Sequence, residues 1–220
     1  SDTYGETSPE NILQFLEKNK WGKMYQNRPI NESDILNRDD YKVKRKSLRE
    51  KMVLRKKNRR LDIGPYITIY FENRDTILHQ INEMVYIENG GDEQIKEEIL
   101  AYKSLIPNGK ELVATLMVEI DSPVKRADFL GKMGGFEEHL DFIVNNKVIK
   151  GKPESDVERT TADGKASSVQ FVHFEFDEEA IKEFTVTNKD VIITINHDNY
   201  KHSTIMNQET KDELSMDFTT

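Results

Sequence analysis

The sequence has no cysteine, and this absence excludes several kinds of site. Without thiols the chain cannot form disulfide bonds, supply a cysteine nucleophile, or ligate zinc or an iron–sulfur cluster through sulfur. Apolar runs are short as well, since none approaches the roughly 18 residues of a membrane-spanning helix. No basic segment leads into an apolar one, so we expect no signal peptide. We therefore expect a cytoplasmic protein that does not enter a membrane.

The sequence motifs of several large enzyme classes are missing too. The chain has neither the glycine–lysine loop of P-loop nucleotide-binding proteins nor the three-glycine loop of dinucleotide-binding folds. It also lacks the His-Glu-x-x-His motif of zinc peptidases and the Gly-x-Ser-x-Gly turn of serine hydrolases. The sequence therefore indicates no particular reaction. Hypotheses about function have to come from the distribution of charge and from clusters of polar side chains.

Charge is abundant and unevenly distributed. Acidic and basic residues make up 33% of the chain, more than the roughly 25% of average proteins, and the net charge is -8. Between Lys42 and Arg60 there are 11 basic residues and one acidic residue, Glu50, so this segment carries +10 and the remainder -18. Such a segment attracts polyanions, but it can equally lie against the acidic part of its own chain. We favour the second interpretation, because the acidic remainder repels a phosphate backbone.

The pattern of apolar residues predicts an N-terminal arm followed by one α+β domain. The arm is expected over residues 1–37, with a helix that begins at Ser8 as its N-cap. Residues 38–220 are expected to form the single domain, with a helical, basic part over 38–110 and a sheet part over 111–200. The sheet is expected to be mainly antiparallel.

Individual elements follow from the spacing of apolar residues and from the turn residues between them. Helices are expected over 38–60 after a cap at Asn37, to about residue 88 after a cap at Asn73 or Asp75, from 92 onward, and over 123–133, 177–184 and 207–215. Strands are expected over 66–72, 112–120, 138–145, 147–152, 168–176 and 190–196, with a polar loop over 153–167. Between 112 and 196 the main elements alternate in the order of a ferredoxin-like βαββαβ unit.

One face of the predicted basic helix combines arginines with packing residues. At about 100° per residue, three arginines project from the same side as an apolar stripe. An unpaired buried charge is costly, so arginines among packing residues predict carboxylate partners. The residues that share this face are Tyr41, Arg45, Leu48, Met52, Arg55 and Arg59.

Possible partners of these arginines follow the strand over 66–72. Glu72 and Arg74 lie where that strand gives way to a helix, and Gln80 and Glu83 share a face of this helix. We favour a network in which Glu72 and Glu83 pair with the arginines. An Arg/Glu cluster in a cleft can also bind an anion, so the cluster is the candidate site for a small anionic ligand or a protein partner. The candidate ligand-binding residues are Arg45, Arg55, Arg59, Glu72, Arg74, Gln80 and Glu83.

Two groups of side chains contain the ligand types that divalent metals accept. Glu72, His79 and Glu83 form the first group, which lacks the Glu-x-x-His spacing of di-iron proteins. The second follows the last predicted strand, where His197 and His202 could bind a divalent metal. A divalent metal is thus the one cofactor that the residues suggest.

Other side chains near the two histidines allow acid–base chemistry. Tyr200 lies between His197 and His202 in a segment expected to be a loop, and loops after strands often carry binding groups. His173, in contrast, lies within the strand over 168–176. We expect His173 to be a structural residue with satisfied hydrogen bonds.

From about residue 31 to residue 216 the chain resembles a bacterial family known only as a domain of unknown function. Where that family has His-Pro, this chain has His197-Asp198. The segments that carry the resemblance are Tyr41-x-x-x-Arg45, Arg59-Arg60, Leu61–Pro65, Thr68–Thr76, Gln80-Ile81-x-Glu83-Met84, Leu105–Gly109, Ala114–Glu119, Ser168–Phe171 and His197-x-x-Tyr200.

The resemblance implies no established activity. It implies a gene neighbourhood with rubrerythrin-like and iron–sulfur oxidoreductase genes, and hence an accessory role in redox or oxidative-stress metabolism. Our preferred hypothesis is accordingly an accessory protein that binds a small anionic ligand or a protein partner. The alternatives are a metal-dependent enzyme that uses the Glu and His residues named above, and binding of nucleic acid through the basic helix, which we do not expect.

Overall fold

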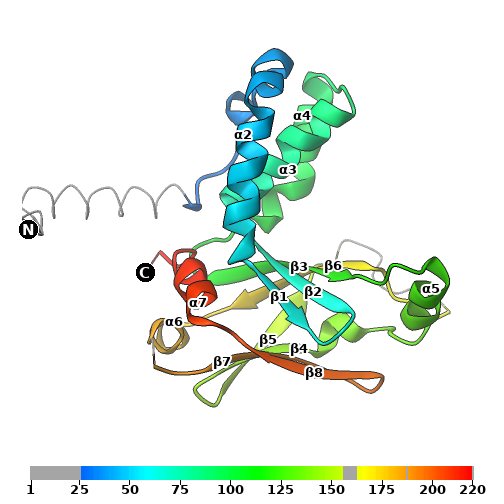
Figure 1. Cartoon of the computed structure of the whole chain (residues 1–220). Coiled ribbons are helices and arrows are strands. Elements are labelled where there is room, and N and C mark those ends of the chain that lie inside the picture. The colour runs from blue at the N-terminus through cyan, green and yellow to red at the C-terminus, as the bar shows by residue number, and fades with distance from the viewer. Residues whose placement is uncertain (1–25, 156–162, 187, 220) are drawn as a thin grey trace, which may run out of the picture.

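The computed structural model describes residues 26–155, 163–186 and 188–219. Three helices stand on one side of a curved sheet, and shorter helices lie around that sheet (Figure 1). The prediction of an α+β protein with a mainly antiparallel sheet is confirmed. Within these residues, no helix has both the length and the apolar composition needed to span a membrane. The helix predicted at Ser8 and part of the loop predicted over 153–167 lie outside the described residues.

The helical part consists of α2 (Arg38–Lys57), α3 (Arg74–Ile87) and α4 (Asp92–Tyr102). Asparagine caps begin the first two helices. The side chain of Asn37 accepts a hydrogen bond from the backbone N–H of Asp40, and that of Asn73 accepts one from the N–H of Thr76. These caps satisfy backbone donors that have no partner within a helix, which is why the helices begin where they do.

The basic helix ends earlier than the pattern predicts. It was expected to reach residue 60, whereas α2 ends at Lys57 and the chain turns into a β-hairpin. Gly64 in the hairpin turn has a φ of 71°, which favours glycine. A Cβ at this position would also lie 2.5 Å from the hydroxyl oxygen of Tyr200. The turn therefore depends on a contact with a residue far along the chain, which the local pattern does not reveal.

The strands are β1 (Arg60–Ile63), β2 (Ile67–Glu72), β3 (Glu111–Val118), β4 (Leu140–Val144), β5 (Lys147–Pro153), β6 (Val169–Glu175), β7 (Val191–His197) and β8 (Tyr200–Ile205). They form one sheet in the order β1-β2-β3-β6-β5-β4-β7-β8, and every neighbouring pair is antiparallel. Shorter helices complete the chain: α5 (Pro123–Gly131), α6 (Glu178–Thr185), α7 (Gln208–Ser215), η1 (Glu32–Asp34), η2 (Lys103–Leu105) and η3 (Phe136–His139).

The predicted ferredoxin-like unit is absent from this sheet. Such a unit is a split βαβ arrangement with the strand order 4-1-3-2, in which the last strand lies next to the first. Here the last of the four predicted strands, β7, pairs with β4 rather than with β3, and β5 lies between β6 and β4. The prediction was wrong because element order does not determine which strands become neighbours.

The two ends of the sheet come together, so the sheet is nearly closed (Figure 1). The hydroxyl group of Tyr200 on β8 donates a hydrogen bond to the carbonyl of Ile63 on β1. The same oxygen accepts from the backbone N–H groups of Tyr66 and Ile67, at 3.1 and 3.3 Å. We call this set of contacts the Tyr200 seam. The segment around Tyr200 is thus a strand that closes the sheet, which corrects the prediction of a loop.

Side chains fill the inside of this sheet. On β2 the inward residues Ile67, Ile69 and Phe71 alternate with outward ones, as a strand with one core face requires. The core continues into the helices at one end of the sheet, where Phe184 of α6 and Phe218 after α7 lie with ring centroids 5.6 Å apart. The concave face of the nearly closed sheet therefore encloses a packed hydrophobic core.

A second, smaller core joins the helical part to the outer face of the sheet. Ile77 and Ile81 of α3 pack with Leu105 and with the outward residues Val113 of β3 and Phe171 of β6. The helices cover only part of this outer face. The remainder forms one wall of the cleft described below.

Candidate functional site

The arginine-bearing face of α2 packs against α3, and its charges are paired within the chain. Arg45 donates two hydrogen bonds to Glu83, from Nε to Oε1 at 2.9 Å and from Nη2 to Oε2 at 3.0 Å. Tyr41 donates a third hydrogen bond to Oε1, with a length of 2.6 Å. The guanidinium group also lies over the ring of Tyr86, 4.7 Å from its centroid. The pairing of Arg45 with Glu83 is one that the sequence analysis favoured.

These contacts hold Glu83 in its ionised form. The hydrogen bonds from Arg45 outweigh the effect of burial, and with that from Tyr41 they lower the pKa of Glu83 to about 2. Burial is the largest cause that raises the pKa of Tyr41, and its hydrogen bond to Glu83 adds to the effect. The Arg45 guanidinium is therefore already engaged by a carboxylate of its own chain.

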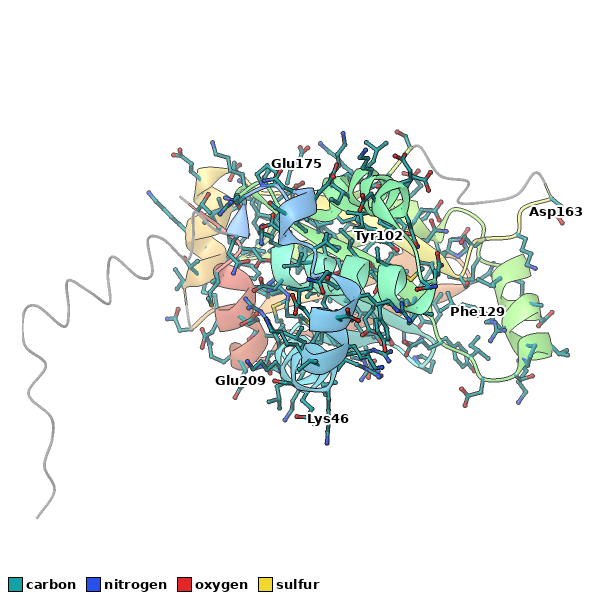
Figure 2. The ribbon with its side chains drawn as sticks, turned by 90° about the horizontal axis from the view of Figure 1, so that it is seen from above. Lys46, Tyr102, Phe129, Asp163, Glu175 and Glu209 are labelled. Atoms are coloured by element: carbon teal, nitrogen blue, oxygen red, sulfur yellow. The ribbon has the colours of Figure 1, made fainter. Side chains whose placement is uncertain are left out.

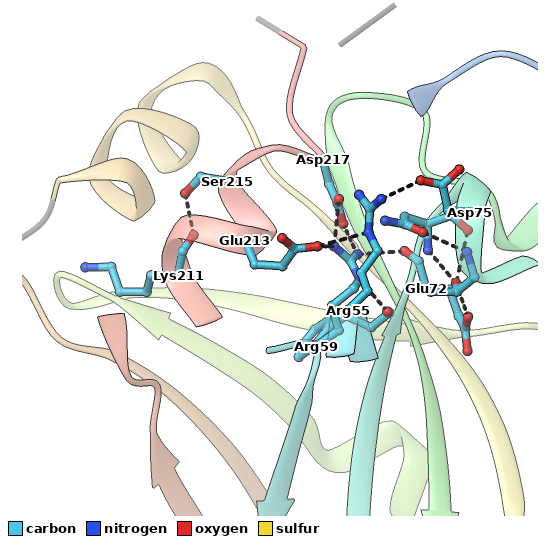
Figure 3. A network of polar contacts seen from close by, with 11 residues as sticks. Arg55, Arg59, Glu72, Asp75, Lys211, Glu213, Ser215 and Asp217 are labelled. Atoms are coloured by element: carbon cyan, nitrogen blue, oxygen red, sulfur yellow. Dashed lines mark hydrogen bonds and ion pairs between the residues drawn. The ribbon is translucent and has the colours of Figure 1, made fainter. Parts of the chain in front are cut away.

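The next two arginines pair with acids at the start of α3 and at the C-terminal end of the chain. Arg55 contacts Asp75 at 2.5 Å and Glu213 at 3.4 Å. Arg59, which is 1% exposed, contacts Glu213 at 3.2 Å and Asp217 at 2.5 Å. Figure 3 shows both guanidinium groups directed toward these acids. The predicted carboxylate partners exist, but for Arg55 and Arg59 they are not Glu72 or Glu83, as predicted; they come from the start of α3 and from the end of the chain.

The guanidinium group of Arg74 is also bound by groups of its own chain. Its Nε donates to the carbonyl of Arg28 at 2.9 Å, and its Nη2 lies 3.0 Å from a carboxylate oxygen of Asp34. The side chain is 1% exposed. Arg74 therefore ties the segment before α2 to the start of α3, and its guanidinium faces its own chain rather than a cavity.

The backbone carbonyl of Glu72 accepts a hydrogen bond from Arg59, but the side chains of Glu72 and Gln80 line a separate cleft between the helical part and the outer face of the sheet. Its volume is about 340 Å³, within the range of roughly 300–1,000 Å³ that ligand pockets occupy. We call it the Glu72 cleft. Its lining residues are Lys56, Tyr70, Glu72, Thr76, Ile77, Gln80, Tyr102, Leu105, Thr115, Met117, Val169 and Phe171.

Two threonines hold the carboxylate of Glu72 in place. Thr115 of β3 donates to Oε1 at 3.1 Å, and Thr76 of α3 donates to Oε2 at 2.5 Å. Thr76 is itself fixed, because its hydroxyl also accepts a hydrogen bond from the backbone N–H of Asn73 at 2.9 Å. A carboxylate oriented from both sides in this way keeps lone pairs available for a donor in the cleft.

Three further polar groups face the Glu72 cleft. Burial raises the pKa of Tyr102, while the hydrogen bond that its oxygen forms with Gln80 acts in the opposite direction. The side chain of Lys56, at the end of α2, is half-buried and forms no ion pair with the residues that the structure describes. Lys56 is therefore an ammonium group that borders a cavity and has no carboxylate partner in that part of the chain.

The rest of the cleft is apolar, and some of it is open to solvent. Met117 and Val169 lie opposite each other on β3 and β6 and are 36% and 40% exposed. Phe171 lies opposite Thr115 in the next row of the same face. Sequence reasoning missed Lys56, Thr115 and Tyr102. The alternation along residues 112–120 could have placed Thr115 and Met117 on one face, but not beside Glu72.

The first predicted metal group is not assembled. His79 lines a different groove, between α2 and α3, with a volume of about 250 Å³. The carboxylate of Glu83 forms an ion pair with Arg45. Burial and the nearby Lys56 lower the pKa of His79. Within residues 26–155, 163–186 and 188–219 no three His, Asp or Glu side chains are grouped so as to hold a metal ion.

The histidines after the last predicted strand have structural contacts. Nε2 of His197 donates to the carbonyl of Gly134 at 3.0 Å, and Nδ1 accepts from the backbone N–H of Asn199 at 3.1 Å. The ring of His202 packs on Tyr200, with 4.4 Å between centroids. Because both nitrogens of His197 are bonded to backbone groups, His197 is not free to act with His202 as a metal ligand.

The chain from residue 29 to residue 218 matches the family model described as "Protein of unknown function (DUF3501)". The chain belongs to the DUF3501 family. This confirms the resemblance to an uncharacterised family. A search of the curated proteins finds no match. Among solved structures, the chain is similar to a crystal structure of a protein of unknown function from Burkholderia pseudomallei K96243, at 25% identity and a TM-score of 0.80. The match covers 87% of this chain and 100% of that one.

Segments that carry the DUF3501 resemblance surround the Glu72 cleft. Thr68–Thr76 supplies Glu72, and Ala114–Glu119 supplies Thr115. Ser168–Phe171 adds the apolar wall on β6. The comparisons therefore give the chain a family and a fold, and the chemistry of its site has to come from the side chains.

His173 is a structural residue, as predicted. Its contacts lead us to expect that the stability of the fold depends on pH. Its ring nitrogens lie 3.0 Å from Glu111 and 2.9 Å from Glu154. Burial opposes a charged ring, but the two glutamates outweigh it and raise the pKa of His173 above 6.5. The charged His173 therefore stabilises the folded state. This stabilisation is complete below the pKa of His173 in the unfolded chain and is lost as the pH rises through its pKa in the folded chain.

We expect the free energy of unfolding to fall by roughly 1 kcal/mol more in the parent chain than in His173→Gln between about pH 6 and about pH 9. The measurement is urea unfolding at a series of pH values. His202→Gln is the control, because no acid contacts that ring within the described residues. Parallel pH profiles for the parent and His173→Gln would contradict the assignment of a charged His173.

Proposed function

We propose that the protein binds a small amphipathic organic acid in the Glu72 cleft. The observation that carries this proposal is Lys56, a half-buried lysine that lines a partly apolar cavity and has no ion-pair partner in the described residues. A charge in such a position is costly unless an opposite charge approaches it. A carboxylate, sulfonate or phosphate of a ligand would supply that charge.

The other groups in the cleft define the rest of the ligand. Glu72, held by Thr76 and Thr115, would accept a hydrogen bond from an N–H or O–H of the ligand. The apolar part of the ligand would lie against Met117 and Phe171, where the sheet is left uncovered by the helices. These features support a ligand with an acid group, a nearby donor and a flat apolar body.

This proposal keeps part of the site suggested by the sequence. Glu72 and Gln80 stay in it, while Arg45, Arg55 and Arg59 leave it because carboxylates of the chain already engage them. The accessory role in redox or oxidative-stress metabolism, which the family resemblance implies, stays a prediction. No feature of the described residues favours the metal-dependent enzyme over ligand binding.

Anilinonaphthalene sulfonate is a suitable probe, because it combines an acid group, an N–H donor and apolar rings. We expect the fluorescence of the probe to increase with the concentration of folded protein and to saturate with a stoichiometry of one probe per chain. Met117→Trp should abolish this binding by filling the cleft. Lys56→Gln should weaken it about tenfold, which corresponds to roughly 1.4 kcal/mol. A fluorescence titration, with circular dichroism as a check that the variants are folded, measures both effects.

Two matched variants make the test specific. Val148→Trp places the same bulk on β5, at a residue that is 54% exposed and lies outside the cleft. Lys57→Gln removes the neighbouring charge, which is exposed. If either control changed probe binding as much as its partner variant does, the probe would bind elsewhere and the proposed site would be wrong.

A further inference from the structure

The face of α2 that points away from α3 is basic and uncovered in the described part of the chain. Figure 2 shows Lys46 extending from this face into solvent. α2 contains ten basic and three acidic residues, in a chain with a net charge of -8. Seven of its cations are exposed and form no ion pair with the described residues: Arg38, Lys42, Lys44, Lys46, Arg49, Lys51 and Lys57.

Apolar side chains are mixed with these cations. Val53 and Leu54 are 70% and 72% exposed, and Val43 is 83% exposed. A helix face that only meets water is normally polar throughout. Val53 and Leu54 line an open groove of about 790 Å³ together with four cations, one acid and one ring of α3: Lys42, Arg45, Lys46, Arg49, Glu50 and Tyr86. The groove therefore offers both charge and apolar surface.

The spacing along α2 suits an elongated partner. Lys42, Lys46, Arg49 and Val53 are separated by four, three and four residues, so they lie along one side of the helix. This row extends over about 17 Å at 1.5 Å per residue. A second helix laid along the row could contact every member of it.

We propose that the outer face of α2 docks an acidic amphipathic helix of a partner protein. The unpaired cations select for acidic residues, and Val53 and Leu54 select for apolar ones in the same segment. Nucleic acid fits less well, because the exposed apolar side chains of Val53 and Leu54 offer nothing to phosphates. This surface is separate from the Glu72 cleft, so the two proposals stand or fall independently.

The test uses a fluorescently labelled helical peptide of about twenty residues, roughly 30 Å long, with glutamates and leucines alternating along one face. Anisotropy is measured with the full chain at about 150 mM salt. We expect saturable binding that Lys46→Glu with Arg49→Glu weakens at least about tenfold. Lys150→Glu with Lys201→Glu, which reverses two exposed charges on β5 and β8, should leave binding unchanged.

Two further sets of measurements distinguish an acidic amphipathic helix from other polyanions. Val53→Ser with Leu54→Ser should weaken peptide binding several-fold, and a peptide with serines in place of its leucines should bind equally weakly. A DNA duplex of similar length should bind more weakly than the acidic peptide at the same salt concentration. Equal binding of the serine peptide, tighter binding of the duplex, or no binding of the acidic peptide would each overturn the proposal.

Discussion

Replacing Arg59 by alanine is expected to lower the free energy of unfolding by about 3–5 kcal/mol. The guanidinium group donates to the carbonyls of Phe71 and Glu72 and contacts Glu213 and Asp217. Its removal leaves the carboxylate of Asp217, which is 1% exposed, buried without its cation. The loss is large because Arg55, the other cation near Asp217, is already paired with Asp75 and Glu213. Urea unfolding followed by circular dichroism measures this change.

Arg60 provides the control for this prediction. Its side chain is 46% exposed and pairs with Asp62 near the surface, so Arg60→Ala should change stability by no more than about 0.5 kcal/mol. A double variant, Arg59→Met with Asp217→Leu, should be more stable than Arg59→Ala, since it leaves no lone charge in the pair. Equal effects of Arg59→Ala and Arg60→Ala would show that the buried network does not hold α7 in place.

Replacing Tyr200 by phenylalanine is expected to cost about 2–4 kcal/mol, although only one oxygen is lost. That oxygen donates to the carbonyl of Ile63 and accepts from the N–H groups of Tyr66 and Ile67. Ile67 and Ile63 are buried, so water cannot replace the missing hydrogen bonds. We expect the Tyr200 seam to loosen, and hydrogen exchange of β1 and β8 to become faster than in the parent chain.

Tyr66→Phe is the matched control for the seam. Tyr66 is 44% exposed, and its hydroxyl group forms no hydrogen bond with the described residues. We expect this variant to stay within about 0.5 kcal/mol of the parent chain. If Tyr200→Phe were as stable as Tyr66→Phe, the hydroxyl would have no structural role, and the acid–base role suggested by the sequence would become the better explanation of its position.

Short-range signals explain why many elements could be predicted. The caps Asn37 and Asn73 identify the starts of α2 and α3 from their own side chains. Asn145 and Asn146, both with positive φ, form the tight turn that joins β4 and β5, between the strands expected over 138–145 and 147–152. In each case the residues that determine the conformation lie within a few positions of one another.

The carboxylate partners of the arginines could be predicted only in part from the sequence. Three arginines on one helix face predict carboxylates, and carboxylates are present. Glu83 could be named in advance because the acids that follow the strand over 66–72 were expected to pair with the arginines. Asp217 could not be named, since it lies 158 residues from Arg59 and only the return of α7 to the base of α2 brings it there.

The sequence alone thus determined the family, the α+β class, the caps and turns, and the need for acids opposite the arginines, because each depends on composition or on neighbours along the chain. Only the tertiary structure decided the order of the strands, the closure at Tyr200 and the meeting of Lys56, Glu72 and Tyr102 around one cleft. These features depend on pairing between distant segments. Many pairings satisfy the same local pattern, and packing of the whole core selects one of them.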